Sequence, residues 1–378
     1  MSAKRVLIVG GGLAGLSLAI ALRERRQAVS VVERARGWVT TGAGLYLVGA
    51  GTRALNAIGL AASAQGIGNV TRTQTLCTHR GARLAELDVD AYWARCGPCL
   101  GLERAVLHRV LAERVAGLPV RFGVTVSALR ESGGEVEVRL TDEASEQYDL
   151  VVGADGIRSA VRRLALGGPP PRFRGQVGWR FLARRPPGID GWTVYLGRSG
   201  AFLLLPIDGD RVYCYADRLV PGPIADPPTG RIERLRELFR RFAAPVREVL
   251  DQLDAPEQIH FAAIEEAAHT SWGQGSVLLI GDAAHAMSPN MACGAALAFE
   301  DALVLAELVA HAGAASSTSA GVLPEFRRRR AERVDWVRQQ TNRRDRLRRL
   351  PPTLRDPVLR LLAERTYRAN YRPLLIPP

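Results

Sequence analysis

The chain has 378 residues, of which 47% are hydrophobic and 24% charged, a composition typical of a soluble globular protein with a core divided between two or more lobes. Its formal net charge is +13, carried almost entirely by arginine, because Lys4 is the only lysine. No apolar run is long enough to span a bilayer and no signal-peptide pattern precedes the first predicted strand, so we expect a cytoplasmic protein without a membrane span.

The first elements in the chain predict a strand, a glycine-rich turn and a helix. Residues 5–9 form a short apolar run rich in β-branched side chains, typical of a buried parallel strand, and leucines at near-helical spacing follow it. Gly10 permits a sharp turn, Gly12 lets the backbone approach a pyrophosphate, and Gly15 lets helix and strand pack closely. Because the helix end then offers free N–H groups to phosphates, the pattern predicts a dinucleotide site.

The second predicted strand, residues 29–33, ends in an acidic side chain. Glu33 stands where a carboxylate can hold a ribose hydroxyl, which argues against a phosphate on that ribose, although the adjacent Arg34 weakens the argument. The glycine fingerprint does not separate FAD from NAD, so the identity of the dinucleotide stays open at this point.

Cys96 and Cys99 have the CxxC spacing of redox proteins, with Gly-Pro between them. A redox pair of this kind requires a core strand before it and a helix that opens at the first cysteine. Residues 88–93 resemble a loop instead, and the next helix begins only after Glu103. We therefore expect neither a redox-active dithiol nor a zinc site, and five cysteines in so long a chain do not indicate a disulfide framework.

Three further segments place a polar residue after a predicted strand. Residues 100–103 lead into a helix that opens with Arg104, whose guanidinium suits phosphate geometry. Two later apolar runs are followed by Asp155 and by Gly281-Asp282. Each aspartate can also be an Asx-turn or a helix cap that binds no ligand.

Residues 175–268 are rich in predicted strands. Short apolar runs alternate there with Gly- and Asp-containing turns and predict an antiparallel sheet that covers a pocket; the runs are residues 193–196, 201–205 and 211–215. Residues 230–253 and 294–311 have helical patterns.

A dense cluster of arginines fills residues 327–349. Contact with nucleic acid or another anionic surface is one interpretation of such a cluster. Acidic residues are interleaved with the arginines, however, and Val334 and Val337 indicate an amphipathic helix with a solvated basic face. We therefore expect no nucleic-acid partner.

The fingerprint of residues 6–15 with Glu33, the segment 150–159 with Asp155, and the segment 278–285 with Asp282 occur in this order. Together they resemble the single-component aromatic hydroxylases of the flavin monooxygenase family, the para-hydroxybenzoate hydroxylase type. The resemblance implies an α/β fold with a Rossmann-type FAD-binding lobe, an inserted, mostly antiparallel β-sheet substrate lobe, and C-terminal helices. The implied divisions are an FAD-binding domain of residues 1–70, 99–175 and 270–340, a substrate-binding domain of residues 71–98 and 176–269, and a C-terminal helical segment of residues 341–378.

The same resemblance implies the cofactor and the reaction. NADH or NADPH reduces FAD, oxygen adds to give a flavin C4a-hydroperoxide, and one oxygen atom is delivered to an aromatic ring. The cofactor-binding residues that it implies are Gly10, Gly12, Gly15, Glu33, Arg34, Arg104, Val126, Asp155, Gly281, Asp282 and Gly294.

Within residues 281–302, Pro289 falls where the family places a proline beside the flavin face that reacts with oxygen. The turn after it, up to Gly294, would offer backbone N–H groups to the ring. This chain departs from the usual Gly-Gln-Gly-x-Asn of the family, because its residues 292–296 are Ala-Cys-Gly-Ala-Ala. We expect the backbone N–H groups of this turn to donate hydrogen bonds to the flavin ring despite the changed side chains.

No motif marks the substrate residues. A phenol hydroxylase needs a base or hydrogen-bond acceptor near the phenol, and the candidates from loop and sheet positions are Tyr46, Arg180, Tyr213, Tyr215 and His260. Arg180 could pair with a substrate carboxylate, and it forms the candidate catalytic set with Tyr215 and Pro289. A purely structural role is the alternative for each, since aromatic side chains on strands usually pack.

Other flavin chemistries share these motifs, so an epoxidase or a reductase/dehydrogenase of a biosynthetic pathway remains an alternative, and a basic nucleic-acid-binding flavoprotein a distant one. A flavin halogenase needs an active-site lysine, and Lys4 precedes the first strand. The expected partners are an aromatic small molecule, O2 and NAD(P)H, in a monomer or homodimer without metal.

Overall fold

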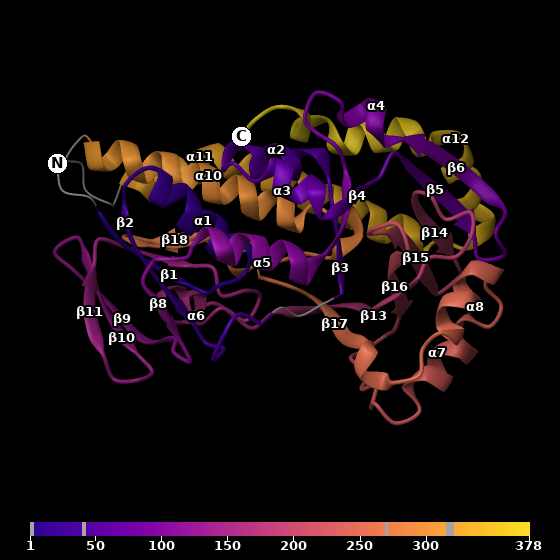
Figure 1. The fold of residues 1–378 in the computed structure, drawn as a ribbon, viewed down its shortest axis with the longest axis horizontal. Coiled ribbons are helices and arrows are strands. Elements are labelled where there is room, and N and C mark those ends of the chain that lie inside the picture. The colour runs from indigo at the N-terminus through magenta and orange to yellow at the C-terminus, as the bar shows by residue number, and fades with distance from the viewer. Residues whose placement is uncertain (1–3, 40–42, 269–270, 315–320) are drawn as a thin grey trace.

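The computed structural model describes residues 4–378 apart from 40–42, 269–270 and 315–320. The molecule is elongated, with a mostly parallel sheet toward one end, a mostly antiparallel sheet toward the other, and long C-terminal helices along one side (Figure 1). The α/β class expected from the sequence is confirmed.

A six-stranded sheet is the centre of the first lobe. Its strands lie in the order β18, β19, β12, β1, β2, β8, with bounds Gly273–Gln274, Val277–Leu279, Leu150–Gly153, Arg5–Val9, Ala28–Glu33 and Val120–Phe122. All neighbours are parallel except β18 and β19. The central strands are buried on both faces, which is why they are continuous runs of branched apolar residues.

Strand register brings the three sequence motifs together. Val9 of β1 lies opposite Gly153 of β12, and Gly153 lies opposite Leu279 of β19. Because parallel strands in register end at the same edge, the glycine turn, Asp155 and Asp282 all follow the carboxyl edge of this sheet. In open α/β sheets ligands bind at that edge.

Helices and two small sheets complete this lobe. Helix α1 packs against α10 and α5, and α6 packs against β12 and β19. The helices are α1 (Leu13–Glu24), α2 (Gly49–Ala57), α3 (Ala61–Gly66), α5 (Arg104–Arg114), α6 (Ala160–Leu166), α9 (Asp282–His285) and α10 (Gly294–Ala314). One small sheet joins β3 (Gly44–Leu47), β7 (Leu100–Glu103) and β4 (Gly68–Val70), and the other joins β11 (Ser145–Tyr148), β10 (Glu135–Leu140) and β9 (Val126–Ser132).

A seven-stranded sheet forms the second lobe, in the order β17, β13, β16, β15, β14, β5, β6. Its bounds are His260–Glu266, Arg172–Arg184, Arg211–Leu219, Gly200–Pro206, Trp192–Leu196, Thr73–Thr78 and Arg83–Asp88. Its outer face packs on α7 (Arg231–Phe239) and α8 (Ala244–Asp251) through a separate aromatic core that contains Phe181, Phe202 and Phe239. The three predicted strands of this region are β14, β15 and β16.

Residues 230–253 are helical, as predicted, and form two helices, α7 and α8, because Pro245 lacks the N–H that a continuous helix needs but fits the first turn of a new one. One local prediction was wrong. Residues 88–93 are not a loop: α4 (Val89–Trp93) is capped by the Asp88 carboxylate, which accepts a hydrogen bond from the Ala91 N–H at 2.9 Å.

The C-terminal part is helical. Helix α11 (Val322–Arg349) buries Val334 and Val337, as the amphipathic pattern predicted, and continues without a break through position 341, where the C-terminal segment was expected to begin. Helix α12 (Pro352–Tyr371) and the short turn η4 (Arg372–Leu375) follow; the other short turns are η1 (Pro256–Gln258) and η2 (Pro289–Met291). The division of the chain into domains stays a prediction.

Candidate functional site

The glycine turn leaves an open surface in front of α1. A Cβ on Gly10, whose φ is +109°, would lie 2.5 Å from the Ala154 carbonyl oxygen, and one on Gly15 would lie 1.9 Å from the Gly10 carbonyl oxygen. A Cβ on Gly12 would meet nothing within 4 Å. Gly10 and Gly15 are therefore required by packing, whereas Gly12 faces space beside a helix end that no side chain caps. This surface fits a pyrophosphate.

Glu33 is held at the same turn. Its carboxylate accepts hydrogen bonds from the backbone N–H groups of Gly11 at 2.7 Å and Ala35 at 2.8 Å, which fixes it at the end of β2. His108 of α5 lies 2.7 Å from the Gly11 carbonyl oxygen through Nε2, which must carry the proton because a carbonyl only accepts. Sequence reasoning missed His108, since its sole signal was a position one turn along a helix from Arg104.

Arg34 and Arg104 differ in their surroundings. Arg34 is exposed, whereas Arg104 is half-buried at the first position of α5, directly after β7, as the sequence predicted. Within the described ranges neither guanidinium has a carboxylate partner. Val126 is buried at the start of β9, so only its backbone could face a ligand.

Asp155 serves partly as a helix cap. Its Oδ2 accepts from the N–H groups of Ala160 at 2.7 Å and Val161 at 3.2 Å, at the start of α6. Its Oδ1 is buried and has no hydrogen-bond partner among the described residues. Burial raises the pKa of the Asp155 carboxyl. The cap therefore accounts for one oxygen, and the other is available to a bound molecule.

Gly281 brings Asp282 close to α1. Its φ is +57°, and a Cβ there would lie 3.0 Å from the Cβ of Ala14, so only glycine allows this approach. Asp282 itself is exposed at the first position of α9, and within the described ranges its carboxylate has no hydrogen-bond or ion-pair partner. The acidic group is therefore presented at the carboxyl edge of the sheet, next to the glycine turn.

A buried ion cluster fixes this edge from behind. Asp301 of α10 accepts from the Gly281 N–H at 3.0 Å, from His285 Nε2 at 2.6 Å and from Arg330 Nε at 2.8 Å. Arg330 also donates to Glu300 at 2.8 Å, and all four side chains of the cluster are almost fully buried. Burial alone would raise the pKa of Asp301, but His285 and Arg330 hold it at about 2. His285 ends the third sequence motif, but sequence analysis did not predict its bond to Asp301 or the rest of the cluster.

Pro289 begins the turn η2, which precedes α10. Pro289 is exposed, Ala292 takes a left-handed backbone with φ +50°, and a Cβ on Gly294 would meet nothing within 4 Å. The two ends of the segment, Pro289 and Gly294, are therefore exposed, whereas Met291 and Cys293 between them are buried.

The inner face of the seven-stranded sheet carries most of the predicted substrate residues. In β13 and β16, Trp179, Phe181 and Cys214 point to the outer core, so by alternation Arg180 and Tyr215 point inward. Arg180 lies opposite both Tyr215 and His260 in the sheet, and its guanidinium lies 5.1 Å from the centroid of the Tyr215 ring.

The tyrosines of this face are neutral hydrogen-bonding groups. Burial raises the pKa of Tyr213, although Arg180 opposes it, and burial together with Asp217 raises the pKa of Tyr215. The Tyr215 hydroxyl accepts from Gln176 Nε2 at 3.3 Å, which leaves its own proton free to donate. His260 is exposed in the structure, but partial burial and the charges of Arg180 and Arg104 lower the pKa of its imidazole, which favours the unprotonated form at neutral pH.

Tyr46 lies apart from that row. It is buried in β3, and its hydroxyl accepts from Gln74 Nε2 at 2.9 Å. Thr41 and Gly42, shortly before β3, lie outside the described residues. β3 nevertheless touches the inner sheet face, because a Cβ on Gly44 would lie 2.2 Å from the Tyr213 ring.

The two cysteines of the CxxC segment lack the features of a redox pair. Burial raises the pKa of the Cys96 thiol, and burial raises that of Cys99 to about 12, whereas redox-active cysteines have a lowered pKa. The described residues contain no group of His, Cys, Asp or Glu that could hold a metal ion.

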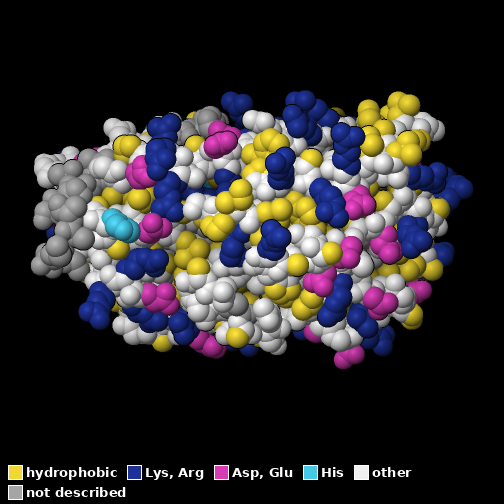
Figure 2. All heavy atoms as spheres, turned by 90° about the horizontal axis from the view of Figure 1, so that it is seen from above, with side chains coloured by type: hydrophobic (Ala, Val, Ile, Leu, Met, Phe, Trp, Pro, Cys, Tyr) yellow, Lys and Arg dark blue, Asp and Glu magenta, His cyan; other side chains and the backbone are white. Residues whose placement is uncertain are grey.

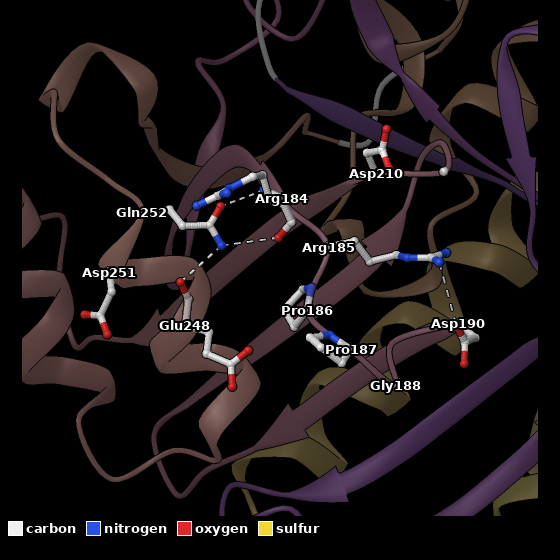
Figure 3. A pocket seen from close by; sticks show the side chains of 11 residues that line it. Arg184, Arg185, Pro186, Pro187, Gly188, Asp190, Asp210, Glu248, Asp251 and Gln252 are labelled. Carbon is white, nitrogen blue, oxygen red and sulfur yellow. Dashed lines mark hydrogen bonds and ion pairs between the residues drawn. The ribbon is translucent and has the colours of Figure 1, made fainter.

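A hollow of about 870 Å³ lies elsewhere, between the end of β13, the turn after β15 and helix α8 (Figure 3). Gln252 there bonds to the backbone of Arg184, and Arg185 lies 3.9 Å from Asp190. None of its lining residues belongs to the predicted site, so we assign the site to the carboxyl edge of the parallel sheet.

On the face shown in Figure 2, arginines are dispersed among acidic and apolar side chains and form no continuous basic band. Several arginines of α11 bond inside the molecule, as Arg330 does. Within the described ranges, no helix is long and apolar enough to cross a membrane.

Known proteins resemble this chain over most of its length. Residues 3–341 match the family described as FAD binding domain. The chain is 33% identical to the 3-amino-4-hydroxybenzoate 2-monooxygenase of Streptomyces platensis, over 90% of this chain and 87% of that protein. It is 32% identical to the aurachin C monooxygenase/isomerase of Stigmatella aurantiaca, over 80% of this chain and 79% of that protein. The Klebsiella pneumoniae HpxO structure with FAD and uric acid superimposes with a TM-score of 0.82 and 26% identity, over 98% of this chain and 92% of that one.

Proposed function

The chain belongs to the FAD binding domain family, as a single-component FAD-dependent aromatic monooxygenase, and on this premise we propose that its substrate is an aromatic ring carrying an anionic or carbonyl oxygen that Arg180 binds. The protein is an oxidoreductase that uses FAD, NAD(P)H and O2 to hydroxylate an aromatic small molecule. Reduced FAD supplies the reaction with oxygen, and the protein supplies position and exclusion of water.

We propose that the carboxyl edge of the parallel sheet holds FAD. The N-terminus of α1 and Arg104 would bind the phosphates, Glu33 would bind the adenosine ribose, and Asp282 would bind the ribityl and pyrophosphate portion. The open space at Gly12 and the unpartnered Oδ1 of Asp155 support this assignment. The backbone from Pro289 to Gly294 would contact the flavin ring.

The surroundings of Arg180 are the main support for the substrate proposal. Its guanidinium is half-buried on the inner face of a sheet and has no carboxylate partner among the described residues, whereas Arg330 and Arg348 on α11 each pair with one. An unpaired cation in such a place favours a ligand with an anionic or strongly polarised oxygen. The relative named for 3-amino-4-hydroxybenzoate acts on a molecule of that kind, which supports the proposal.

The neighbours of Arg180 divide the remaining roles. Tyr215, neutral and with its proton free, would donate a hydrogen bond to the substrate. His260, whose unprotonated form is favoured at neutral pH, would accept the proton of a phenol and so raise the electron density of the ring. We place these steps in the cytoplasm, where NAD(P)H is regenerated.

Replacing Arg180 by glutamine will weaken binding of an aromatic carboxylate at least about ten-fold, because a hydrogen bond to a charged group contributes about 1.5–3 kcal/mol. Titration of the FAD-loaded protein with aromatic acids, followed by the change in flavin absorbance, gives the dissociation constant. The matched control is Arg184→Gln, an exposed arginine at the end of the same strand. Equal affinity of R180Q and R184Q for every acid that binds would refute the assignment.

A further inference from the structure

The turn that begins at Pro289 is held by the C-terminal helices as well as by its own local hydrogen bonds. Arg344 of α11 donates to the Asn290 carbonyl oxygen at 3.0 Å and to the Tyr371 hydroxyl at 3.0 Å. The Tyr371 hydroxyl in turn donates to the Met291 carbonyl oxygen at 2.9 Å. The backbone of η2 is thus fixed by one arginine and one tyrosine that come from outside the glycine and aspartate motifs.

Two more residues of α11 hold the side chain of Asn290. Its amide nitrogen donates to the Asp345 carboxylate, and its amide oxygen accepts from Arg348 Nη1 at 2.9 Å. Asp345 also accepts from the Ser288 hydroxyl at 3.3 Å. Arg344, Asp345 and Arg348, which we call the α11 clamp, therefore satisfy both ends of the Asn290 amide and one backbone carbonyl.

The turn needs this support because of Ala292. Its φ of +50° lies in the left-handed region, which costs a residue with a Cβ roughly 1–2 kcal/mol relative to glycine. A non-glycine residue keeps such a conformation only where its surroundings impose it. The Ala292 N–H donates within the turn to the Pro289 carbonyl oxygen at 2.8 Å, and the carbonyls of the two residues before Ala292 are held by α11 and α12.

The clamp also reaches the substrate sheet. Arg348 forms an ion pair with Asp217 of β16, and Asp217 accepts from the Ala201 N–H at 3.2 Å. Asp217 lies two residues from Tyr215 on the same face of that strand. One helix therefore contacts both the turn assigned to the flavin ring and the strand assigned to the substrate.

We propose that Arg344, Asp345 and Arg348 are positioning residues that hold the Pro289–Gly294 turn in its working shape and stabilise the left-handed backbone of Ala292 within it. The proposal rests on the proposed function, because the turn matters for catalysis only if it faces FAD. It also gives the arginine-rich helix α11 a role within the molecule.

Hydrogen–deuterium exchange on the FAD-loaded full chain tests the clamp without a known substrate. We expect Arg344→Met to raise the exchange of the backbone amides of residues 288–294 at least about ten-fold, while the amides of α1 stay unchanged. Adding Ala292→Gly should lower that exchange by roughly five-fold, because glycine removes the strain that the clamp opposes. The matched control is Arg346→Met, an exposed arginine of the same helix.

The possible outcomes distinguish a failure of the clamp proposal from a failure of the proposed function. Equal exchange in R344M and R346M, or no reversal by A292G, would overturn the clamp. Failure of the unmodified protein to bind FAD would overturn the proposed function, and the same comparison of R344M with R346M on the FAD-free full chain would still test the clamp. If R344M does not fold, the isosteric D345N replaces it, with the same expected change at residues 288–294.

The amount of hydrogen peroxide released per NAD(P)H consumed distinguishes a role of the clamp in positioning the turn from a role in stability alone. Once an aromatic acid that binds is known, R344M should release at least about three-fold more hydrogen peroxide per NAD(P)H consumed than R346M, because a displaced turn no longer excludes water. A lower melting temperature with an unchanged peroxide ratio would show that the clamp is structural only.

Discussion

Replacing Gly12 by tryptophan will abolish FAD retention and leave the fold intact. Nothing lies within 4 Å of a Cβ at this position, so the protein itself can accept a side chain there. The same space is where we propose that the backbone approaches the pyrophosphate of FAD, and an indole would fill it. We expect affinity for FAD to fall at least about 100-fold, which corresponds to roughly 2.7 kcal/mol.

Equilibrium titration of the apoprotein with FAD, read by flavin fluorescence, measures this effect, and circular dichroism verifies the fold. Gly66→Trp is the matched control, since a Cβ at Gly66 also meets nothing within 4 Å and Gly66 ends α3, outside the assigned site. Asp282→Ala should likewise lose FAD, because the Asp282 carboxylate has no hydrogen-bond or ion-pair partner among the described residues. Folded G12W protein with a full complement of FAD would show that the site is misplaced.

Replacing Asp301 by asparagine will destabilise the protein by about 3–5 kcal/mol, the usual consequence of breaking one partner of a buried ion cluster. The change weakens the hydrogen bonds to Gly281, His285 and Arg330 together. Since Gly281 positions Asp282, FAD retention should fall with stability. Denaturant unfolding of the apoprotein separates the two effects, because no cofactor then contributes.

The dependence of stability on pH tests the prediction for Asp301→Asn independently. The pKa of Asp301 is held at about 2 in the folded protein, below the value of an unfolded aspartate. Its stabilisation is therefore complete above pH of about 4 and is lost as the pH falls toward about 2. D301N should lose the part of the acid transition that lies in this window. Glu325→Gln, which removes an exposed ion pair, should leave the melting temperature unchanged; an identical acid transition in D301N would refute the role of Asp301.

The sequence predicted the parts of the site that depend on short-range patterns. Gly10, Gly12, Gly15 and Glu33 could be read from a strand, a turn and a helix in order, because each role follows from local backbone geometry. That Asp155 and Asp282 meet them could be inferred only by resemblance. The physical reason is the register of β1, β12 and β19, which no local pattern encodes.

The supporting groups could not be predicted, because their partners are distant in the sequence. Asp301 and Arg330 bond across 29 positions, and His108 reaches Gly11 across 97. The α11 arginines were interpreted as a solvated face, since composition cannot distinguish an exposed guanidinium from one bonded to a buried carbonyl or carboxylate. Asp88 was overlooked as a helix cap for a different reason. The helix that it caps, α4, has only five residues, which is too short to show a helical pattern in the sequence.

The most direct test of the central claim is the transfer of one oxygen atom from O2 to an aromatic molecule. The purified FAD-loaded protein is incubated with NADH or NADPH and a panel of phenols, aromatic acids and quinolones under isotopically labelled oxygen gas, and the products are analysed by mass spectrometry. The account predicts one labelled atom in a hydroxylated product, formed from an acid that R180Q binds poorly. A hydroxylated product whose new oxygen comes from water, or FAD-loaded protein that consumes neither nicotinamide, would contradict it.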